Sequence, residues 1–200
     1  ALYRLKDVGE PTRYLGATIG KYKDPGLECW FMSAKDYLER ALPVIEARFD
    51  LKKFRAEQPL PTSYHPELDT SPELNDDDAR LYMSYIGILQ WAVELGRIDI
   101  TFYVSTMARY LACPRRGHLD KVLQIFAFVK KHLRSKLVLD PEVKDWNDRI
   151  WIEADWSEYY PDAMEIIPSN APPPRGKSVQ INVFCDADHA TDVVTRRLYF

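Results

Sequence analysis

Apolar residues recur at helical spacing between residues 76 and 133, and this pattern most constrains how the chain can fold. The first helical run follows Asn75 and ends at Gly96, the second follows Asp99, and the third follows Pro114. Apolar side chains three and four residues apart lie on one face of a helix, which must then pack against a neighbour. The short links between the runs therefore predict a compact three-helix bundle.

A β-hairpin is predicted ahead of this bundle. Residues 14–20 and 27–32 favour strands, and Asp24-Pro25-Gly26 between them supplies the fixed φ angle and the glycine of a tight turn. Gly16 lies inside the first run and leaves room for another backbone to approach.

A helix and a loop should connect the hairpin to the bundle. Ser33 with Asp36 resembles a capping box, and apolar residues keep helical spacing from Tyr37 to Phe49. Pro43 lies inside this run and is expected to kink or divide the helix. Residues 57–75 are polar and rich in proline, which predicts a connecting loop.

The rest of the chain indicates a tether and the start of another domain. Residues 137–178 are acidic and aromatic, and the prolines near their end form a stiff spacer. The following residues alternate apolar and polar side chains, which predicts a β-strand. The predicted fold class is thus α+β, with a β-hairpin and helix in 1–56, a loop in 57–75, the helical bundle in 76–136, the tether in 137–178 and the first strand of a further domain in 179–200.

Charge is strongly segregated behind a net charge of −3. Residues 57–80 carry seven acids and one base, a net of −6, and residues 137–165 carry nine acids and two bases, a net of −7. Between them, residues 109–136 carry eight bases and one acid, a net of +7. Such a block suits phosphate binding, to which the start of the third helix would add backbone donors, but an ordinary solvated face has the same composition. The candidate phosphate-binding residues are Arg115, Arg116, Lys121, Lys130, Lys131 and Arg134.

Two aspartates near the C-terminus are candidate metal ligands. Asp186 ends an apolar strand and Asp188 follows on the same face, which suits a divalent cation, although a solvated strand end has the same residues. Asp76, Asp77 and Asp78 instead fill the first turn of a helix, where negative charge complements the helix dipole. Consecutive helical residues splay by about 100°, so these three cannot share one ion.

Several classes of protein are excluded. A composition of 46% hydrophobic and 28% charged residues excludes a wholly disordered chain, and no apolar run approaches the roughly 18 residues of a membrane span. The three cysteines lie far apart without a C-x-x-C pair, which disfavours a disulfide scaffold or zinc site and favours a reducing compartment. No P-loop, G-x-G-x-x-G, G-x-S-x-G or H-E-x-x-H motif is present. Since Ala1 already lies in a patterned segment, we expect a piece of a longer protein.

Four segments, in this order, resemble the reverse transcriptase of copia-type retrotransposons. The first is similar to the leucine-glycine hairpin that ends the palm domain, and the next two are similar to the "Y-x-S-x-x-G … T-R-P-D-I" thumb signature and the helix after it. The fourth is similar to the "D-A-D-W-A … R-R-S" opening of the ribonuclease H domain. Gly96, Ile98, His189 and Leu198-Tyr199-Phe200 depart from the family pattern. The segments are Leu5–Glu10 with Tyr14–Gly16, Tyr82–Gly87 with Gly96–Ile100, Tyr110–Pro114 with His118, Lys121 and Val129–Lys130, and Phe184–Ala190 with Thr195–Arg197.

The resemblance implies RNA-directed DNA synthesis coupled to ribonuclease H cleavage as the parent activity. Leu15 and Gly16 would form the primer grip, and the basic third helix of the thumb would track phosphates. Asp186 would be the first ribonuclease H carboxylate, with Mg²⁺ held by Asp186 and Asp188. The paired catalytic aspartates of the polymerase belong upstream of Ala1, so we expect residues 1–200 to bind an RNA–DNA hybrid or primer–template without turnover by themselves.

The same resemblance implies the rest of the Pol polyprotein as a partner, no membrane, and an intracellular location in cytoplasmic virus-like particles or the nucleus. Two other hypotheses stay open on the residues alone. One is a non-catalytic protein-interaction module from a decayed transposon copy. The other is a stand-alone metal-dependent nuclease around Asp186 and Asp188, for which Asp192 is the nearby additional carboxylate.

Overall fold

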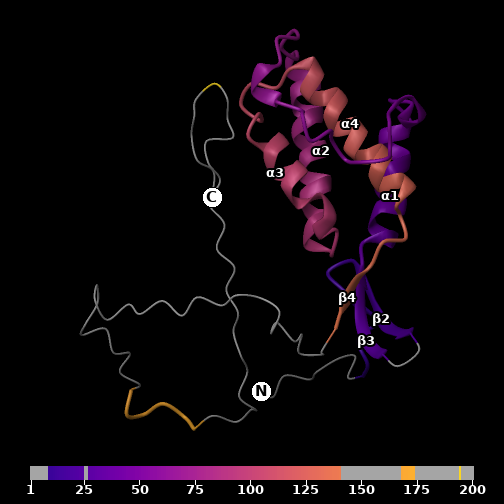
Figure 1. The fold of residues 1–200 in the computed structure, drawn as a ribbon, viewed down its shortest axis with the longest axis vertical. Helices are drawn as coiled ribbons and strands as arrows, with labels where there is room; N and C mark the ends of the chain where they lie inside the picture. Colours follow the sequence, from indigo (N-terminus) through magenta and orange to yellow (C-terminus); the bar gives the residue numbers. More distant parts are fainter. Residues whose placement is uncertain (1–8, 25–26, 141–167, 174–193, 195–200) are drawn as a thin grey trace, which may run out of the picture. The chain divides into compact units, whose positions relative to one another are not determined.

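The structure is a computed structural model that describes residues 9–24, 27–140, 168–173 and 194 (Figure 1). The described part of the chain has the predicted α+β class, with four α-helices and one four-stranded antiparallel sheet. The chain divides into two compact units, one of residues 1–141 with 189–199 and one of residues 142–188 with 200. Of the second unit the structure describes 168–173, where the Ala171 N–H donates to the Pro168 carbonyl (2.9 Å).

The sheet of the first unit has the strand order β1-β2-β3-β4. Pairing of Asp24 with Leu27 confirms the predicted hairpin, whose central residues 25 and 26 lie outside the described ranges. Residues 137–139, which we assigned to the tether, instead pair with the preceding hairpin, because their Leu-Val-Leu run supplies an apolar edge strand. The strands are β1 (Arg13–Tyr14), β2 (Ala17–Asp24), β3 (Leu27–Ser33) and β4 (Leu137–Leu139).

The predicted strand over residues 14–20 is broken by a turn. Tyr14 pairs with Ala17, so Leu15 and Gly16 form a two-residue loop between β1 and β2. Their φ angles are 49° and 99°, and positive φ at both central positions is the requirement of a type I′ turn. The strand propensity of residues 14–20 missed this turn because leucine rarely occupies the left-handed region, whereas the resemblance had implied a leucine-glycine hairpin here.

Three of the four helices match the predicted bundle. Asn75 caps α2 as expected, since its side chain accepts a hydrogen bond from the Asp78 N–H (2.9 Å). The prediction that Asp99 caps the next helix is wrong: Asp99 lies in a 3₁₀ turn (η3) and accepts two hydrogen bonds from Arg97. The helices are α1 (Lys35–Glu46), α2 (Asp76–Glu94), α3 (Thr101–Ala108) and α4 (Arg116–Lys131), and the 3₁₀ helices are η1 (Leu51–Lys53), η2 (Pro66–Leu68) and η3 (Ile98–Ile100).

For α1, the predicted capping box is wrong and the division considered at Pro43 does not occur. Ala34 occupies the cap position without a side-chain cap bond, while the Ser33 hydroxyl donates to the Ser135 carbonyl (3.3 Å) and accepts from the Lys35 N–H (3.3 Å). Pro43 does not divide the helix, which continues to Glu46. Pro43 lies on the exposed side, where water can reach the carbonyl that loses its helical hydrogen bond.

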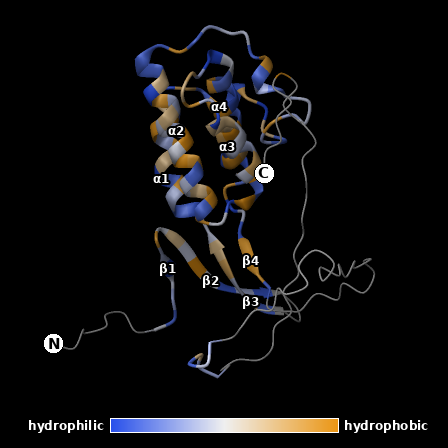
Figure 2. Cartoon of the chain, turned by 90° about the vertical axis from the view of Figure 1, so that its left-hand side faces the viewer, coloured by the Kyte–Doolittle hydropathy of each residue, from blue (hydrophilic) through white to orange (hydrophobic). Residues whose placement is uncertain are grey.

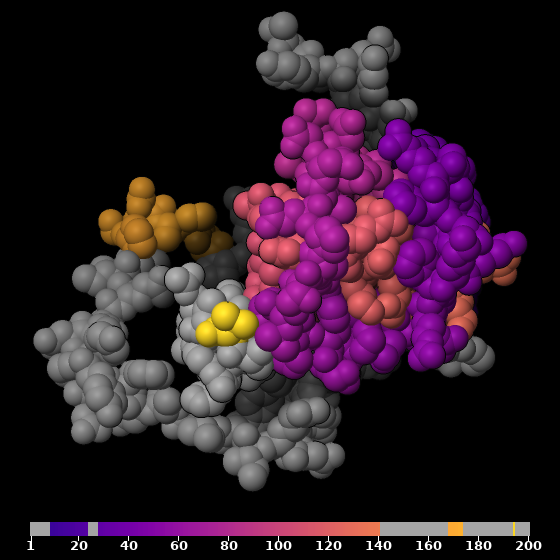
Figure 3. All heavy atoms as spheres, turned by 90° about the horizontal axis from the view of Figure 1, so that it is seen from above, coloured from indigo at the N-terminus to yellow at the C-terminus, as the bar shows by residue number. Residues whose placement is uncertain are grey.

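The helices lie at one end of the sheet, and α4 forms the centre of their core (Figures 1 and 2). Nine of its residues are buried, and residues of α1, of α2 and of the segment 47–75 between them, which we call the connection, surround it in Figure 3. Tyr85 of α2 packs edge-on against Phe126 with ring centroids 5.6 Å apart, and the buried Tyr82 hydroxyl donates to the Met107 carbonyl of α3 (2.7 Å). This packing fixes α2, α3 and α4 as one body.

Two glycines should respond to alanine in opposite ways. Gly16→Ala places a side chain at positive φ and should lower the free energy of unfolding by about 1 kcal/mol. Gly87→Ala lies in the interior of α2 with open space around the new Cβ, and should raise it by about 0.5 kcal/mol. Urea denaturation of both variants measures the two effects, and a stabilising Gly16→Ala would contradict the assigned turn.

Candidate nucleic-acid interface

The Leu15–Gly16 turn lies at the surface beside the C-terminal end of α2. Leu15 is 62% exposed, and a Cβ added to Gly16 would lie 3.9 Å from Leu95 Cδ1, just past the last residue of α2. Behind the turn, the Thr18 hydroxyl donates to the Asp36 carboxylate of α1 (2.9 Å). The turn is therefore exposed but anchored to the helices on two sides.

Leu15 combines a strained backbone with an exposed side chain. Left-handed φ costs a residue with a Cβ about 1–2 kcal/mol, and the exposed side chain recovers little of this through burial. Residues that keep such strain cluster at functional sites. Leu15 is the one non-glycine residue with positive φ in the described part of the chain, a conformation that the two-residue turn requires but that leucine rarely adopts.

An exposed stripe on α2 continues from this turn. Met83, Gly87 and Trp91 are four residues apart on one helix face, and Trp91 precedes Leu95 by one turn. Met83 is 57% and Trp91 41% exposed, while Gly87 has open space where a Cβ would lie. We refer to Leu15, Gly16, Met83, Gly87 and Trp91 as the turn–α2 surface.

Sequence reasoning missed the α2 part of this surface. It used the apolar periodicity of the helix to find the core face, and Tyr82, Tyr85, Ile86 and Leu89 are indeed buried. The missed signal was a second apolar stripe displaced from that face, with a glycine at its middle.

A close contact joins the end of α2 to the sheet. Gly96 has a φ of 106°, and a Cβ there would lie 3.3 Å from Leu137 Cβ and 3.4 Å from the Met32 carbonyl oxygen. The next residue, Arg97, is 1% exposed and donates two hydrogen bonds to Asp99 (2.9 and 2.8 Å). This junction holds the turn–α2 surface in place, because it joins α2 to strands β3 and β4.

Most cations predicted to bind phosphate have carboxylate partners. Lys121 and Arg134 have no carboxylate within 4.0 Å among the described residues. The other four do: Arg115 with Glu73 (3.0 Å), Arg116 with Asp120 (3.7 Å), Lys130 with Glu46, and Lys131 with Glu57 (3.6 Å). The +7 block therefore presents less free charge than its sequence indicates.

The start of α4 is also satisfied from within the protein. The Arg116 N–H donates to the Pro72 carbonyl (2.9 Å), and the Gly117 N–H donates to the Ser71 hydroxyl (2.8 Å). The predicted backbone donors for phosphate at this helix start are thus wrong, because the connection already uses them.

Two ionisable groups fasten the connection to α4. The buried His118 accepts from the Arg115 N–H at Nδ1 (3.1 Å), and its Nε2 lies 3.0 Å from the Pro66 carbonyl oxygen. Desolvation alone would raise the pKa of Asp69, but hydrogen bonds from Ser71 and the positive charge of Arg115 outweigh it and hold that pKa below its usual range. Asp69 is therefore a stabilising carboxylate.

The predicted metal ligands Asp186 and Asp188 lie outside the described residues. Within the described ranges no group of three or more His, Cys, Asp or Glu side chains could hold a metal ion. None of the described helices combines the length and apolar content of a membrane span.

Comparison with known proteins found one clear similarity. The chain is 30% identical over 129 residues to the putative transposon Ty5-1 protein of Saccharomyces cerevisiae. That similarity supports a retrotransposon origin. The match covers 64% of this chain and 39% of the yeast protein, so the chain spans well under half the length of that relative. No protein-family model and no solved structure matches the chain.

Stability in acid should depend on Asp69. Its folded-state pKa is depressed, so the stabilisation is present above the unfolded-state value near 4 and is lost as the pH falls through the folded-state value. Urea denaturation between pH 6 and about pH 3 should show a smaller loss of stability for Asp69→Asn than for the wild type. Parallel pH curves for the two proteins would contradict this role.

Proposed function

We propose that this chain is the nucleic-acid-gripping part of a copia-type reverse transcriptase that binds an RNA–DNA hybrid or primer–template. The observation that carries the proposal is the turn–α2 surface, where a strained, exposed turn adjoins an apolar stripe with a glycine at its centre. The similarity to a yeast transposon protein supports the retrotransposon origin that this proposal assumes.

The chemistry of this surface suits sequence-independent contact with a duplex. Gly16 and Gly87 let a sugar–phosphate backbone approach the protein closely, because neither has a side chain in the way. Met83 and Trp91 offer flat or adaptable apolar contacts that do not depend on base identity. A polymerase that copies any template needs contacts of this kind rather than contacts with base edges.

The C-terminal part of the proposal rests on sequence spacing. Asp186 and Asp188 would hold Mg²⁺, with Asp186 as the first ribonuclease H carboxylate, and the remaining residues of that site would come from elsewhere in a Pol polyprotein. The chain would act in cytoplasmic virus-like particles or the nucleus. We expect no polymerase or nuclease turnover from residues 1–200 alone.

A protein-interaction module is the second candidate function. The observation that favours it is the exposure of Ile98 (61%) in η3 and of Phe102 (73%) in the first turn of α3. This alternative predicts little affinity for an RNA–DNA hybrid and little dependence of that affinity on salt.

Hybrid binding should weaken steeply with salt, because neutralised phosphates release counterions. Lys130→Glu with Lys131→Glu should flatten the plot of log affinity against log salt, since it reverses two charges and leaves Glu46 and Glu57 without their lysine partners. Lys130→Gln with Lys131→Gln is the graded control and should flatten the plot about half as much. Fluorescence anisotropy of a labelled hybrid measures both slopes, and an unchanged slope would count against a phosphate-contacting α4.

A side chain at position 87 should weaken binding of the RNA–DNA hybrid. Gly87→Gln puts a side chain into the middle of the turn–α2 surface and should weaken hybrid binding about tenfold. Because glutamine has a higher helix propensity than glycine, the substitution should keep α2 folded. Ser105→Gln adds a similar side chain at an exposed position of α3 and should leave affinity unchanged. Equal affinities for both variants in the same anisotropy assay would rule out contact at Gly87.

A further inference from the structure

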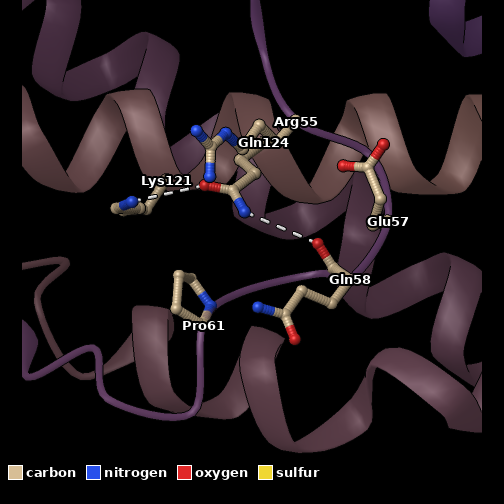
Figure 4. A pocket seen from close by; sticks show the side chains of 6 residues that line it. All are labelled: Arg55, Glu57, Gln58, Pro61, Lys121 and Gln124. Carbon is tan, nitrogen blue, oxygen red and sulfur yellow. Dashed lines mark hydrogen bonds between the residues drawn. The ribbon is translucent and has the colours of Figure 1, made fainter.

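A polar hollow lies between the connection and α4, and none of its lining residues belongs to the turn–α2 surface. Pro59 and Leu60 are buried, and the Gln124 side chain donates to the Gln58 carbonyl (3.5 Å), which holds the connection across the helix. The hollow encloses about 610 Å³, within the usual range for ligand sites. Its lining residues are Arg55, Glu57, Gln58, Pro61, Lys121 and Gln124 (Figure 4).

Two cations of this hollow lack carboxylate partners. Neither Arg55 nor Lys121 has an acidic group within 4.0 Å among the described residues. This distinguishes them from Lys130 and Lys131 at the end of α4, which form ion pairs with Glu46 and Glu57. The hollow therefore holds two positive charges that no carboxylate of the described residues neutralises by an ion pair.

The acidic residue at the rim does not cancel these charges. The Glu57 carboxylate lies 3.6 Å from the Lys131 ammonium and accepts a hydrogen bond from the Ala56 N–H (3.1 Å). A backbone hydrogen bond at Glu57 itself and the Lys131 charge hold its pKa below the usual range. The Glu57 carboxylate is thus paired with Lys131 and forms no ion pair with Arg55 or Lys121.

The lysine at the hollow is held in position from two sides. The Lys121 ammonium donates to Gln124 Oε1 (3.3 Å) and lies 5.0 Å from the centroid of the Tyr64 ring. Gln124 is 8% exposed, and its two hydrogen bonds fix the orientation of its amide. Figure 4 shows Arg55, Lys121 and Gln124 along one side of the hollow and Gln58 and Pro61 along the other.

We propose that this hollow binds a phosphate group, with Arg55 as a forked donor, Lys121 as a point charge and the Gln58 amide as a neutral donor. An arginine and a lysine without acidic partners match the geometry and charge of phosphate oxygens. The phosphate belongs either to a nucleic-acid backbone or to a free phosphate compound. Assigning the bound phosphate to a nucleic-acid backbone rests on the proposed function, whereas phosphate binding itself does not.

Inorganic phosphate is the first probe, added to the full chain at constant ionic strength. The side-chain amide resonances of Gln58 and Gln124 should shift and saturate, and Arg55→Gln should weaken the fitted affinity about tenfold. Lys53→Gln is the matched control, because it removes the same charge from an exposed side chain two residues away that does not line the hollow. Equal effects of the two variants, or amides that do not shift, would overturn the proposal.

Hybrid binding is the second arm and separates the two sources of phosphate. If the phosphate belongs to nucleic acid, Arg55→Gln and Lys121→Gln should each weaken hybrid affinity more than Lys53→Gln at the same salt. Loss of phosphate binding with unchanged hybrid affinity would support a free phosphate ligand and overturn the nucleic-acid source. A wild type that binds phosphate but no hybrid would refute the proposed function and leave the phosphate site standing.

Discussion

Burial of α4 is the constraint on which the rest of the structure depends. Nine residues of this helix are buried, and they pack against α1, α2, α3 and the connection. Each fully buried large apolar side chain contributes roughly 1.5–3 kcal/mol, so this helix carries much of the core. The connection must then cross the helix closely, and it does so with hydrogen bonds to Arg115, Arg116 and Gly117. An earlier part of the connection crosses α4 at Gln58 and Gln124, and there it forms the polar hollow at Lys121.

The fold class and the bundle could be predicted because helical periodicity and capping chemistry are local. Asn75 caps α2 through its own side chain, and that bond needs no tertiary information. Two local expectations failed where tertiary contacts compete, since Ser33 bonds to Ser135 and residues 137–139 pair with β3. The Asp99 cap failed for a local reason, because its carboxylate accepts hydrogen bonds from Arg97 two residues earlier. The partners of Ser33 and of residues 137–139 could not be found from neighbouring residues alone.

The candidate site was predictable only in part, for a related reason. The family resemblance identified Leu15 and Gly16 as candidate site residues. Their exposure and the closeness of Gly16 to Leu95 could be seen only in the three-dimensional structure. Charge counts found the basic segment, yet they could not show that Lys130 and Lys131 are paired with acids from other segments. Arg55 escaped notice because it lies outside the basic segment 109–136 and gains its significance from Lys121, which lines the same hollow.

The helical part leaves the sheet after β3 and returns to it at β4, the neighbouring strand. These two covalent crossings are linked by the Ser33–Ser135 hydrogen bond, and Gly96 adds a third attachment against Met32 and Leu137. A single connection would let the helices rotate against the sheet, and two would still allow a hinge motion about the line that joins them. The third attachment, at Gly96, opposes both motions, so the Leu15–Gly16 turn and the exposed face of α2 keep a fixed alignment.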